Sequence, residues 1–183
     1  MLDNRIALND FLAQVQFRAL KHAEIATGDR DDSMDIVQDC MLRLAQKYSD
    51  QPHNWPQLFQ RILQNAIRDW YRKKKVRRIL FWWEQEQTFE EGMDSGEGII
   101  NTCSTVPETP SPEAETAGLQ ISAKVVQALQ HLPERQQQAF LLRAWWGNDI
   151  EETAAIMSCS VGSVKTHYFR AVAKLKTMLD EVL

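Results

Sequence analysis

The chain has 183 residues and a net charge of −4, and 44% of its residues are hydrophobic, which is ordinary for a soluble globular protein. No apolar run approaches the roughly 20 residues needed to cross a bilayer, and the N-terminus lacks the basic start and apolar core of a signal peptide. We therefore expect a cytoplasmic protein that does not insert into membranes. Its three cysteines are widely spaced and form no CxxC pair, so neither a disulfide framework nor a zinc site is indicated.

The charge is unevenly distributed along the chain. Residues 1–78 carry a net charge of +4, residues 79–118 carry −9 without any Lys or Arg, and residues 119–183 carry +1. The central segment also holds four of the seven glycines and three of the six prolines, a composition typical of a linker. The negative net charge thus belongs to this segment and does not argue against DNA binding. The predicted organisation is a domain over 1–80, an acidic flexible linker over 81–118 and a second domain over 119–183.

Both predicted domains are all-α. Apolar residues recur at helical spacing on either side of the linker, and no alternating run of strand type is present. In the first domain, apolar stripes predict helices around 11–19, 36–44 and 58–70, the last starting near Trp55-Pro56, where proline suits a helix start. We expect an N-terminal helical bundle and a C-terminal four-helix domain.

The last part of the chain predicts a helix-turn-helix. Asp149 with Glu152 is a capping-box pattern that opens a short helix over 150–157, and Ser160 can cap the helix that follows. In such a motif the second helix enters the major groove of duplex DNA. With Val164 and Tyr168 turned inward, its outward positions supply donors, cations and an apolar edge for thymine methyl groups. These positions are Ser163, Lys165, Thr166, His167, Phe169 and Arg170.

A second cationic face lies on the third predicted helix, opposite its apolar stripe. It is formed at spacings of four, three, four and three by Arg61, Asn65, Arg68, Arg72 and Lys75. Such a face attracts the phosphates of DNA, and aromatic rings beside cations suit unpaired bases. Trp70 continues the apolar stripe and is expected in the core, whereas Tyr71 lies off the stripe and is expected to contact DNA.

No pattern of a catalytic or cofactor site is present. The four histidines are scattered without HExxH spacing, and the chain has no glycine-rich phosphate loop, no GxSxG elbow and no nucleophile with an evident partner. We expect a protein that is not an enzyme and that uses no metal, no cofactor and no small-molecule substrate.

Two stretches resemble the sigma factors of bacterial RNA polymerase, in their extracytoplasmic-function (ECF) group. The C-terminal stretch looks like the fourth conserved region of the family and comprises 131–142, Gly147, 151–154, 159–166 and 170–171. The N-terminal stretch looks like the second region and comprises 35–39, 42–44 and 62–69 with the basic tail after it. The resemblance covers roughly two thirds of the chain. It implies a sigma factor that binds core RNA polymerase and opens promoter DNA to direct initiation.

The resemblance also implies roles for individual residues. Asp35, Gln38 and Asp39 sit where the family docks onto the clamp of the largest polymerase subunit, and the family also contacts the flap of the second subunit. Asn65, with the loop 49–55, sits where the group separates the strands of the minus-ten element and captures a flipped base. The melted-DNA site is then Arg61, Asn65, Arg68, Tyr71, Arg72 and Lys75. The six outward residues of the last helix correspond to those that read the minus-thirty-five duplex. An anti-sigma factor that masks both domains is a further implied partner.

The chain departs from the family pattern at three places. The loop 49–55 is short and lacks the phenylalanine that many relatives carry there, Thr153 stands where a branched aliphatic residue is usual, and His167 stands where arginine is common. These departures concern contacts to DNA bases and the packing beneath them, so the promoter sequence does not follow from the resemblance.

Two other functions compete with this interpretation. A helix-turn-helix regulator that binds a duplex operator would require, in its two-component form, a receiver domain with strands and a phosphoacceptor carboxylate, and the N-terminal half shows neither. A helical adaptor that binds only proteins through its acidic faces would leave both cationic helices unexplained.

Overall fold

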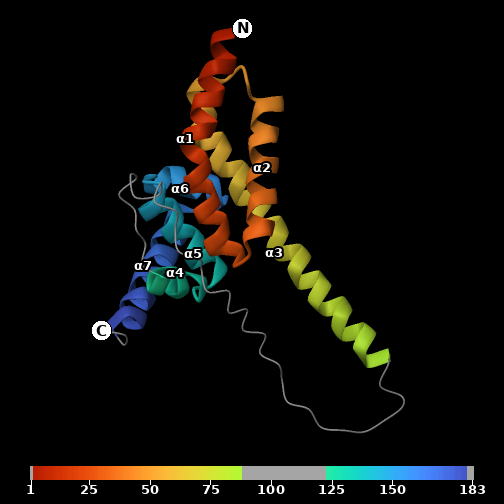
Figure 1. The fold of residues 1–183 in the computed structure, drawn as a ribbon. Coiled ribbons are helices and arrows are strands. Elements are labelled where there is room, and N and C mark those ends of the chain that lie inside the picture. The colour runs from red at the N-terminus through yellow and green to blue at the C-terminus, as the bar shows by residue number, and fades with distance from the viewer. Residues whose placement is uncertain (1, 88–122, 181–183) are drawn as a thin grey trace.

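The computed structural model describes the backbone of residues 2–87 and 123–180 and the side chains of 4–77 and 123–179. Every regular element in these ranges is helical, which confirms the all-α prediction for them (Figure 1). The elements are α1 (Leu2–Thr27), α2 (Arg30–Lys47), η1 (Pro52–Asn54), α3 (Trp55–Gln87), α4 (Ala123–Gln130), α5 (Glu134–Phe140), η3 (Leu141–Trp145), α6 (Ile150–Met157) and α7 (Val161–Asp180). No described helix is long and apolar enough to span a bilayer.

The N-terminal domain is a bundle of α1, α2 and α3 (Figure 1). α2 starts immediately after Gly28, which has φ +71°, and the Asp29 side chain accepts a hydrogen bond from the Asp32 backbone N–H as an N-cap. The predicted apolar stripes form the core, because their central residues are buried. These residues are Ala19, Ala23, Val37, Cys40, Leu44, Phe59, Leu63 and Ile67.

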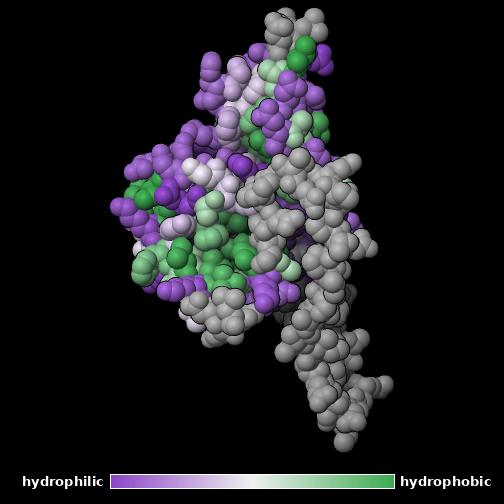
Figure 2. Space-filling view, turned by 60° about the vertical axis from the view of Figure 1, so that its left-hand side comes forward, coloured by the Kyte–Doolittle hydropathy of each residue, from purple (hydrophilic) through white to green (hydrophobic). Residues whose placement is uncertain are grey.

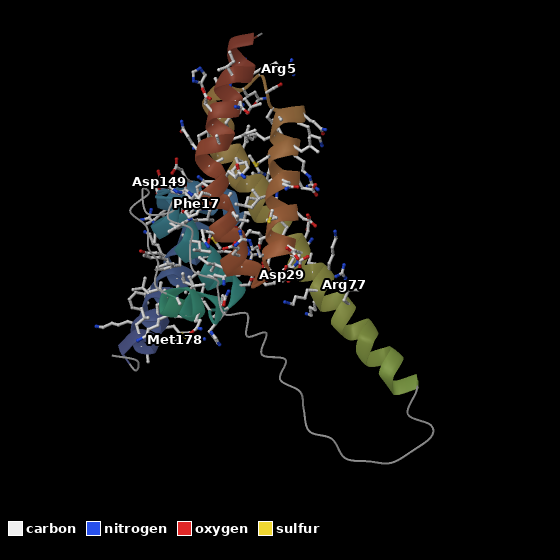
Figure 3. All side chains as sticks on the ribbon, viewed as in Figure 1. Arg5, Phe17, Asp29, Arg77, Asp149 and Met178 are labelled. Carbon is white, nitrogen blue, oxygen red and sulfur yellow. The ribbon has the colours of Figure 1, made fainter. Side chains whose placement is uncertain are left out.

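α3 is longer than the sequence prediction. The first domain was expected to end at residue 80, but the helix continues to Gln87. The sequence of its last residues, Glu84 to Gln87, has no apolar stripe, but Glu and Gln are good helix formers and favour the continuation of an existing helix. Beyond Arg77, which Figure 3 labels, α3 continues away from the bundle (Figure 1). The predicted acidic linker lies from residue 88 onward outside the described residues.

The C-terminal domain is formed by α4, α5, η3, α6 and α7, and the predicted helix-turn-helix is confirmed. At α6 the Asp149 side chain accepts from the Glu152 backbone N–H at 2.7 Å, and Glu152 accepts from the Asp149 N–H at 2.9 Å, which is the expected capping box. Ser158 has φ +52° and ends α6, and the Ser160 hydroxyl oxygen accepts from the Ser163 N–H at 3.1 Å. The turn is thus fixed by its own hydrogen bonds.

The two domains lie against each other in the structure. Trp145 donates its indole N–H to the Arg18 carbonyl oxygen at 3.1 Å, and Gln137 donates to the Ile25 carbonyl oxygen at 3.3 Å. Ile25 belongs to α1, yet it packs in the core formed by α4 and α7. The sequence predicted both domains but not this contact, because hydrophobic periodicity does not distinguish a helix face that covers its own core from one that covers another domain.

Candidate nucleic-acid interface

The first surface lies on the N-terminal half of α7, and its residues are placed as the sequence predicted. Val164 is fully buried against the C-terminal core, which turns the opposite side of the helix to solvent. We call the outward residues the α7 surface; they are Ser163, Lys165, Thr166, His167, Phe169 and Arg170. Lys165 and Arg170 are exposed and form no ion pair with any described residue. Both cations are therefore available to a phosphate or a base edge.

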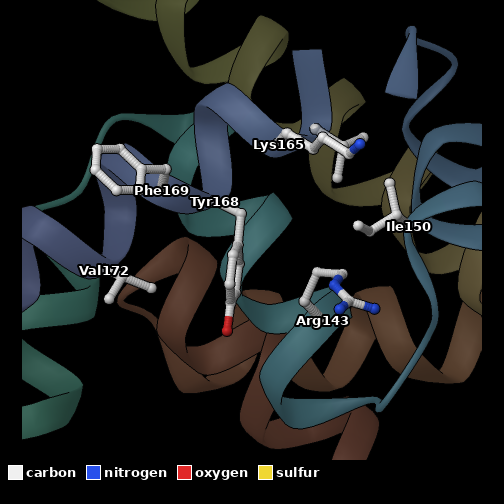
Figure 4. Close-up of a pocket in the computed structure, with 7 residues that line it drawn as sticks. Arg143, Ile150, Lys165, Tyr168, Phe169 and Val172 are labelled. Atoms are coloured by element: carbon white, nitrogen blue, oxygen red, sulfur yellow. The ribbon is translucent and has the colours of Figure 1, made fainter. Parts of the chain in front are cut away.

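An apolar groove of about 400 Å³ borders the α7 surface (Figure 4). Phe169 and Val172 line it and are 75% and 42% exposed. Tyr168 forms the floor, with the Arg143 guanidinium 5.8 Å from its ring centre. The space-filling view shows hydrophobic side chains gathered on the C-terminal domain within a hydrophilic surround (Figure 2). The recognition face thus combines cations with an apolar edge.

Sequence reasoning missed Arg143. It lies on the π-helical turn η3, donates to the Asn148 carbonyl oxygen and shares the groove with Lys165. The available signal was a single cation inside the apolar run 140–146. A lone arginine in such a run packs its stem inside and extends its head to the surface, so this position adds a third cation beside the α7 surface.

The second surface lies on α3, where Arg61, Arg72 and Lys75 are exposed. Asn65 and Arg68 are half-buried and joined by a hydrogen bond of 2.6 Å from the guanidinium to the amide oxygen. This bond occupies the Asn65 amide oxygen and leaves its NH₂ group as the part of the amide that can donate. We call Arg61, Asn65, Arg68, Arg72 and Lys75 the α3 surface.

The two aromatic residues of this region exchange their expected places. Tyr71 was expected to face DNA, but its ring packs against the bundle core, and its hydroxyl donates to the Ala26 carbonyl oxygen at 2.6 Å. Burial raises the pKa of Tyr71 to about 12, and the Glu134 carboxylate adds to the rise. Trp70 was expected in the core, but its indole N–H donates to Asp32 at 2.8 Å, and the Lys74 ammonium lies 4.5 Å from its ring centre. Tyr71 turns inward because both α1 and the second domain contact its hydroxyl, through the Ala26 carbonyl oxygen and the Gln137 amide oxygen.

The beginning of the α3 surface is partly covered by the second domain. A cleft of about 380 Å³ separates α3 from α6, and both Arg61 and Glu151 line it. Across its rim, Gln57 donates to the Glu152 carboxylate at 3.1 Å. Trp55, at the end of the loop 49–55, is 4% exposed and donates to the Tyr48 carbonyl oxygen at 2.8 Å. This ring is therefore part of the core and does not present a stacking face.

The comparisons with known proteins identify the family of the chain. The family model described as Sigma-70, region 4 matches residues 122–175, which include α6, the turn and most of α7. The chain is 32% identical over 174 residues to the ECF RNA polymerase sigma factor EcfG of Rhodopseudomonas palustris, an alignment that covers 93% of this chain and 83% of that one. The chain belongs to the ECF family of RNA polymerase sigma factors. As a sigma factor it directs transcription initiation at promoter DNA.

A further relative supports this assignment, and two solved structures share the fold. This chain is also 32% identical over 152 residues to the sigma factor CnrH of Cupriavidus metallidurans. That alignment covers 81% of this chain and 74% of CnrH. The structure of CnrH in complex with the cytosolic domain of CnrY matches the fold with a TM-score of 0.61 over 97% of this chain and 90% of that one, at 22% identity. The sigma factor RpoE of Bartonella quintana, in complex with the anti-sigma factor NepR, matches with a TM-score of 0.55 over 93% and 97% of the chains, at 19% identity.

A third surface of the sigma factor lies on α2. Asp35, Gln38 and Asp39 are exposed on one side of this helix, where the sequence analysis expects the polymerase contact. The same side exposes two apolar residues that the analysis did not assign to a partner, Met34 at 40% and Leu42 at 55%. Exposed apolar side chains beside acidic ones suit a contact with another protein.

The described residues hold no group of three or more His, Cys, Asp or Glu side chains that could bind a metal ion. Among them, Cys40 is buried, and burial raises the pKa of its thiol to about 12, so it remains a neutral core side chain. Cys159 is half-buried at the turn of the helix-turn-helix.

Proposed function

We propose that this sigma factor contacts promoter DNA with its two domains separately. The α7 surface reads the minus-thirty-five element as duplex, and the α3 surface holds the opened strand of the minus-ten element. The observation that carries the proposal is the presence of two cationic helix faces on different domains, one beside an apolar edge suited to base contacts and one long enough to follow a strand. Tyr71 belonged to the second site in the sequence prediction, but the proposal does not depend on it because its ring packs inward here.

The remaining roles follow the family. One side of α2, with Asp35, Gln38 and Asp39, binds the clamp of the largest polymerase subunit. Met34 and Leu42 add apolar contact there. The C-terminal domain binds the flap of the second subunit. Because two structurally similar sigma factors were solved with NepR and with CnrY, we infer that an anti-sigma factor also binds this chain. The protein acts in the cytoplasm by binding alone, without catalysing a reaction, and its domains correspond to residues 1–80 and 119–183.

Transcription in vitro tests the proposal. Purified core RNA polymerase, the sigma factor and genomic DNA fragments are combined, and the 5′ ends of the transcripts are sequenced. Transcripts should start downstream of a shared pair of elements and should depend on both proteins. The sigma-factor proposal would be overturned if the chain alone bound a specific duplex as tightly as its complex with core polymerase does. It would also be overturned if no sigma-dependent start sites were found.

A further inference from the structure

One side of α1 contacts the second domain. Arg18, His22 and Ile25, spaced by four and three residues, all contact it. The carbonyl oxygens of Arg18 and Ile25 accept hydrogen bonds from the second domain, and their side chains contact it too, whereas the His22 ring takes part in a side-chain hydrogen bond. His22 is 1% exposed, and its Nδ1 lies 2.8 Å from the indole nitrogen of Trp146. His22 is thus the one titratable side chain among these three contacts that can change protonation near neutral pH.

The hydrogen bond fixes the protonation state of His22. The indole N–H of Trp146 is only a donor, so Nδ1 must accept and carries no proton. The proton of the neutral ring is then on Nε2, which is buried and has no hydrogen-bond partner among the described residues. A second proton on Nδ1 would point at the indole N–H, break the bond between the domains and leave a buried cation.

Among the described residues, no free carboxylate is found beside His22 to stabilise that cation. On α1, Arg18 places its guanidinium 5.7 Å from the Trp146 ring centre, and Lys21 and Glu24 pair with each other at 2.7 Å. The neighbouring side chains of α3 and of the segment after η3 are uncharged: Phe59 lies 6.4 Å from the Trp146 ring, and Gln60 accepts from Asn148. Burial therefore lowers the pKa of His22 to about 4, from an ordinary value of 6.5.

The contact must open for promoter binding. The minus-ten and minus-thirty-five elements lie about 25 base pairs apart, roughly 85 Å along a duplex at 3.4 Å per base pair. In the closed structure, α3 and the helix-turn-helix touch through the Gln57–Glu152 hydrogen bond. The two DNA surfaces therefore cannot bind their elements while the domains are in contact.

We propose that the His22–Trp146 pair is a proton-sensitive latch, which holds the two domains together at neutral pH and releases them when the pH falls. His22 is solvated in the open form and buried in the closed form, so the closed form binds fewer protons. Lowering the pH therefore favours the open form, and closure is favoured above pH 6.5 and lost below it. For pKa values of 6.5 open and about 4 closed, the closing constant falls about tenfold between pH 7.5 and 5.5. The protonated chain is thus easier to engage with polymerase and promoter.

Small-angle X-ray scattering of the full chain at pH 7.5, 6.5 and 5.5, at constant ionic strength, tests the latch. The radius of gyration should rise as the pH falls, while circular dichroism at 222 nm shows unchanged helix content. His22→Gln keeps an acceptor for Trp146 but cannot titrate, so its radius should not respond to pH. His131→Gln is the matched control, since His131 is exposed and outside the domain contact; it should behave like the unsubstituted chain.

Three results would overturn the latch. They are an equal radius of gyration at pH 7.5 and 5.5 in the unsubstituted chain, the same pH response in His22→Gln, or an expansion that accompanies loss of helix and is therefore unfolding. Trp146→Phe supplies an independent check, because it removes the donor without adding a charge. It should raise the open fraction at pH 7.5 and reduce the further opening on acidification.

Discussion

The α7 surface and the α3 surface both present cationic side chains, but different parts of the molecule hold them in place. The α7 surface is supported within its own domain: the capping box at α6, the Ser160 cap and buried Val164 fix its orientation. The α3 surface belongs to a helix that packs against two domains, so α6 approaches its beginning and Tyr71 turns inward. The α7 surface is thus shaped within its own domain, whereas the beginning of the α3 surface becomes fully accessible only after the domains separate.

The largest effect is expected on the α7 surface. Lys165→Ala with Arg170→Ala removes two contacts worth about 1–3 kcal/mol each, so affinity for the minus-thirty-five duplex should fall roughly 100-fold. Two fewer phosphate or base cations should also flatten the slope of log affinity against log salt by up to about 1.8. Fluorescence anisotropy with labelled duplex, read on the complex with core polymerase, measures both.

The matched control for this variant is Lys174→Ala with Lys176→Ala, which removes the same charge from the C-terminal half of α7. It should retain most of the duplex affinity. Both double variants should bind core polymerase as the unsubstituted chain does, and loss of core binding in the Lys165 and Arg170 variant would contradict the separation of roles between the domains.

A smaller, stage-specific effect is expected on the α3 surface. Arg68→Ala with Arg72→Ala should slow promoter opening about tenfold and leave closed-complex formation nearly unchanged, because these cations hold a strand that is present only after melting. Permanganate footprinting and filter binding separate the two stages. Lys124→Ala with Lys176→Ala is a charge-matched control in the other domain, and equal losses at both stages would remove the proposed role in strand opening.

The same difference explains what the sequence could predict. The side chains of Lys165, Phe169 and Arg170 lie where the helical period places them, since one packed side of α7 determines the other. For Trp70 and Tyr71 the helical period of the apolar residues was misleading, because both domains pack on neighbouring sides of α3. The contact with the second domain comes from Gln137, more than sixty positions away in the sequence. His22 and Trp146 were missed for this reason too: neither carries a local motif, and only the domain contact pairs them.

The capping box tests whether the helix-turn-helix is self-supporting. Asp149→Ala removes the acceptor for the Glu152 N–H and should lower the free energy of unfolding of the C-terminal domain by about 1 kcal/mol. Asp149→Asn retains an acceptor and should recover most of it. Thermal unfolding followed by circular dichroism measures the change, and a neutral Asp149→Ala would indicate that tertiary packing alone determines α6.

The smallest effect is expected at Tyr71. Tyr71→Phe keeps the packed ring but removes the hydroxyl that donates to the Ala26 carbonyl oxygen and lies 3.3 Å from the Gln137 amide oxygen. The free energy of unfolding should fall by about 0.5–1.5 kcal/mol, and promoter opening should be unchanged. If the Tyr71→Phe chain were as stable as the unsubstituted chain but opened the promoter more slowly, Tyr71 would have to belong to the melted-DNA site after all.

The distance between the two domains tests the account most directly. The full chain is labelled for energy transfer at Gln46→Cys in α2 and Lys176→Cys in α7, with the native cysteines replaced by alanine. We predict high transfer in the free chain at pH 7.5 and loss of that transfer in the open complex with core polymerase and promoter, where the two DNA surfaces lie roughly 85 Å apart. Transfer that is already low in the free chain, or that stays high in the open complex, would contradict a sigma factor that closes on itself and opens to bind its promoter.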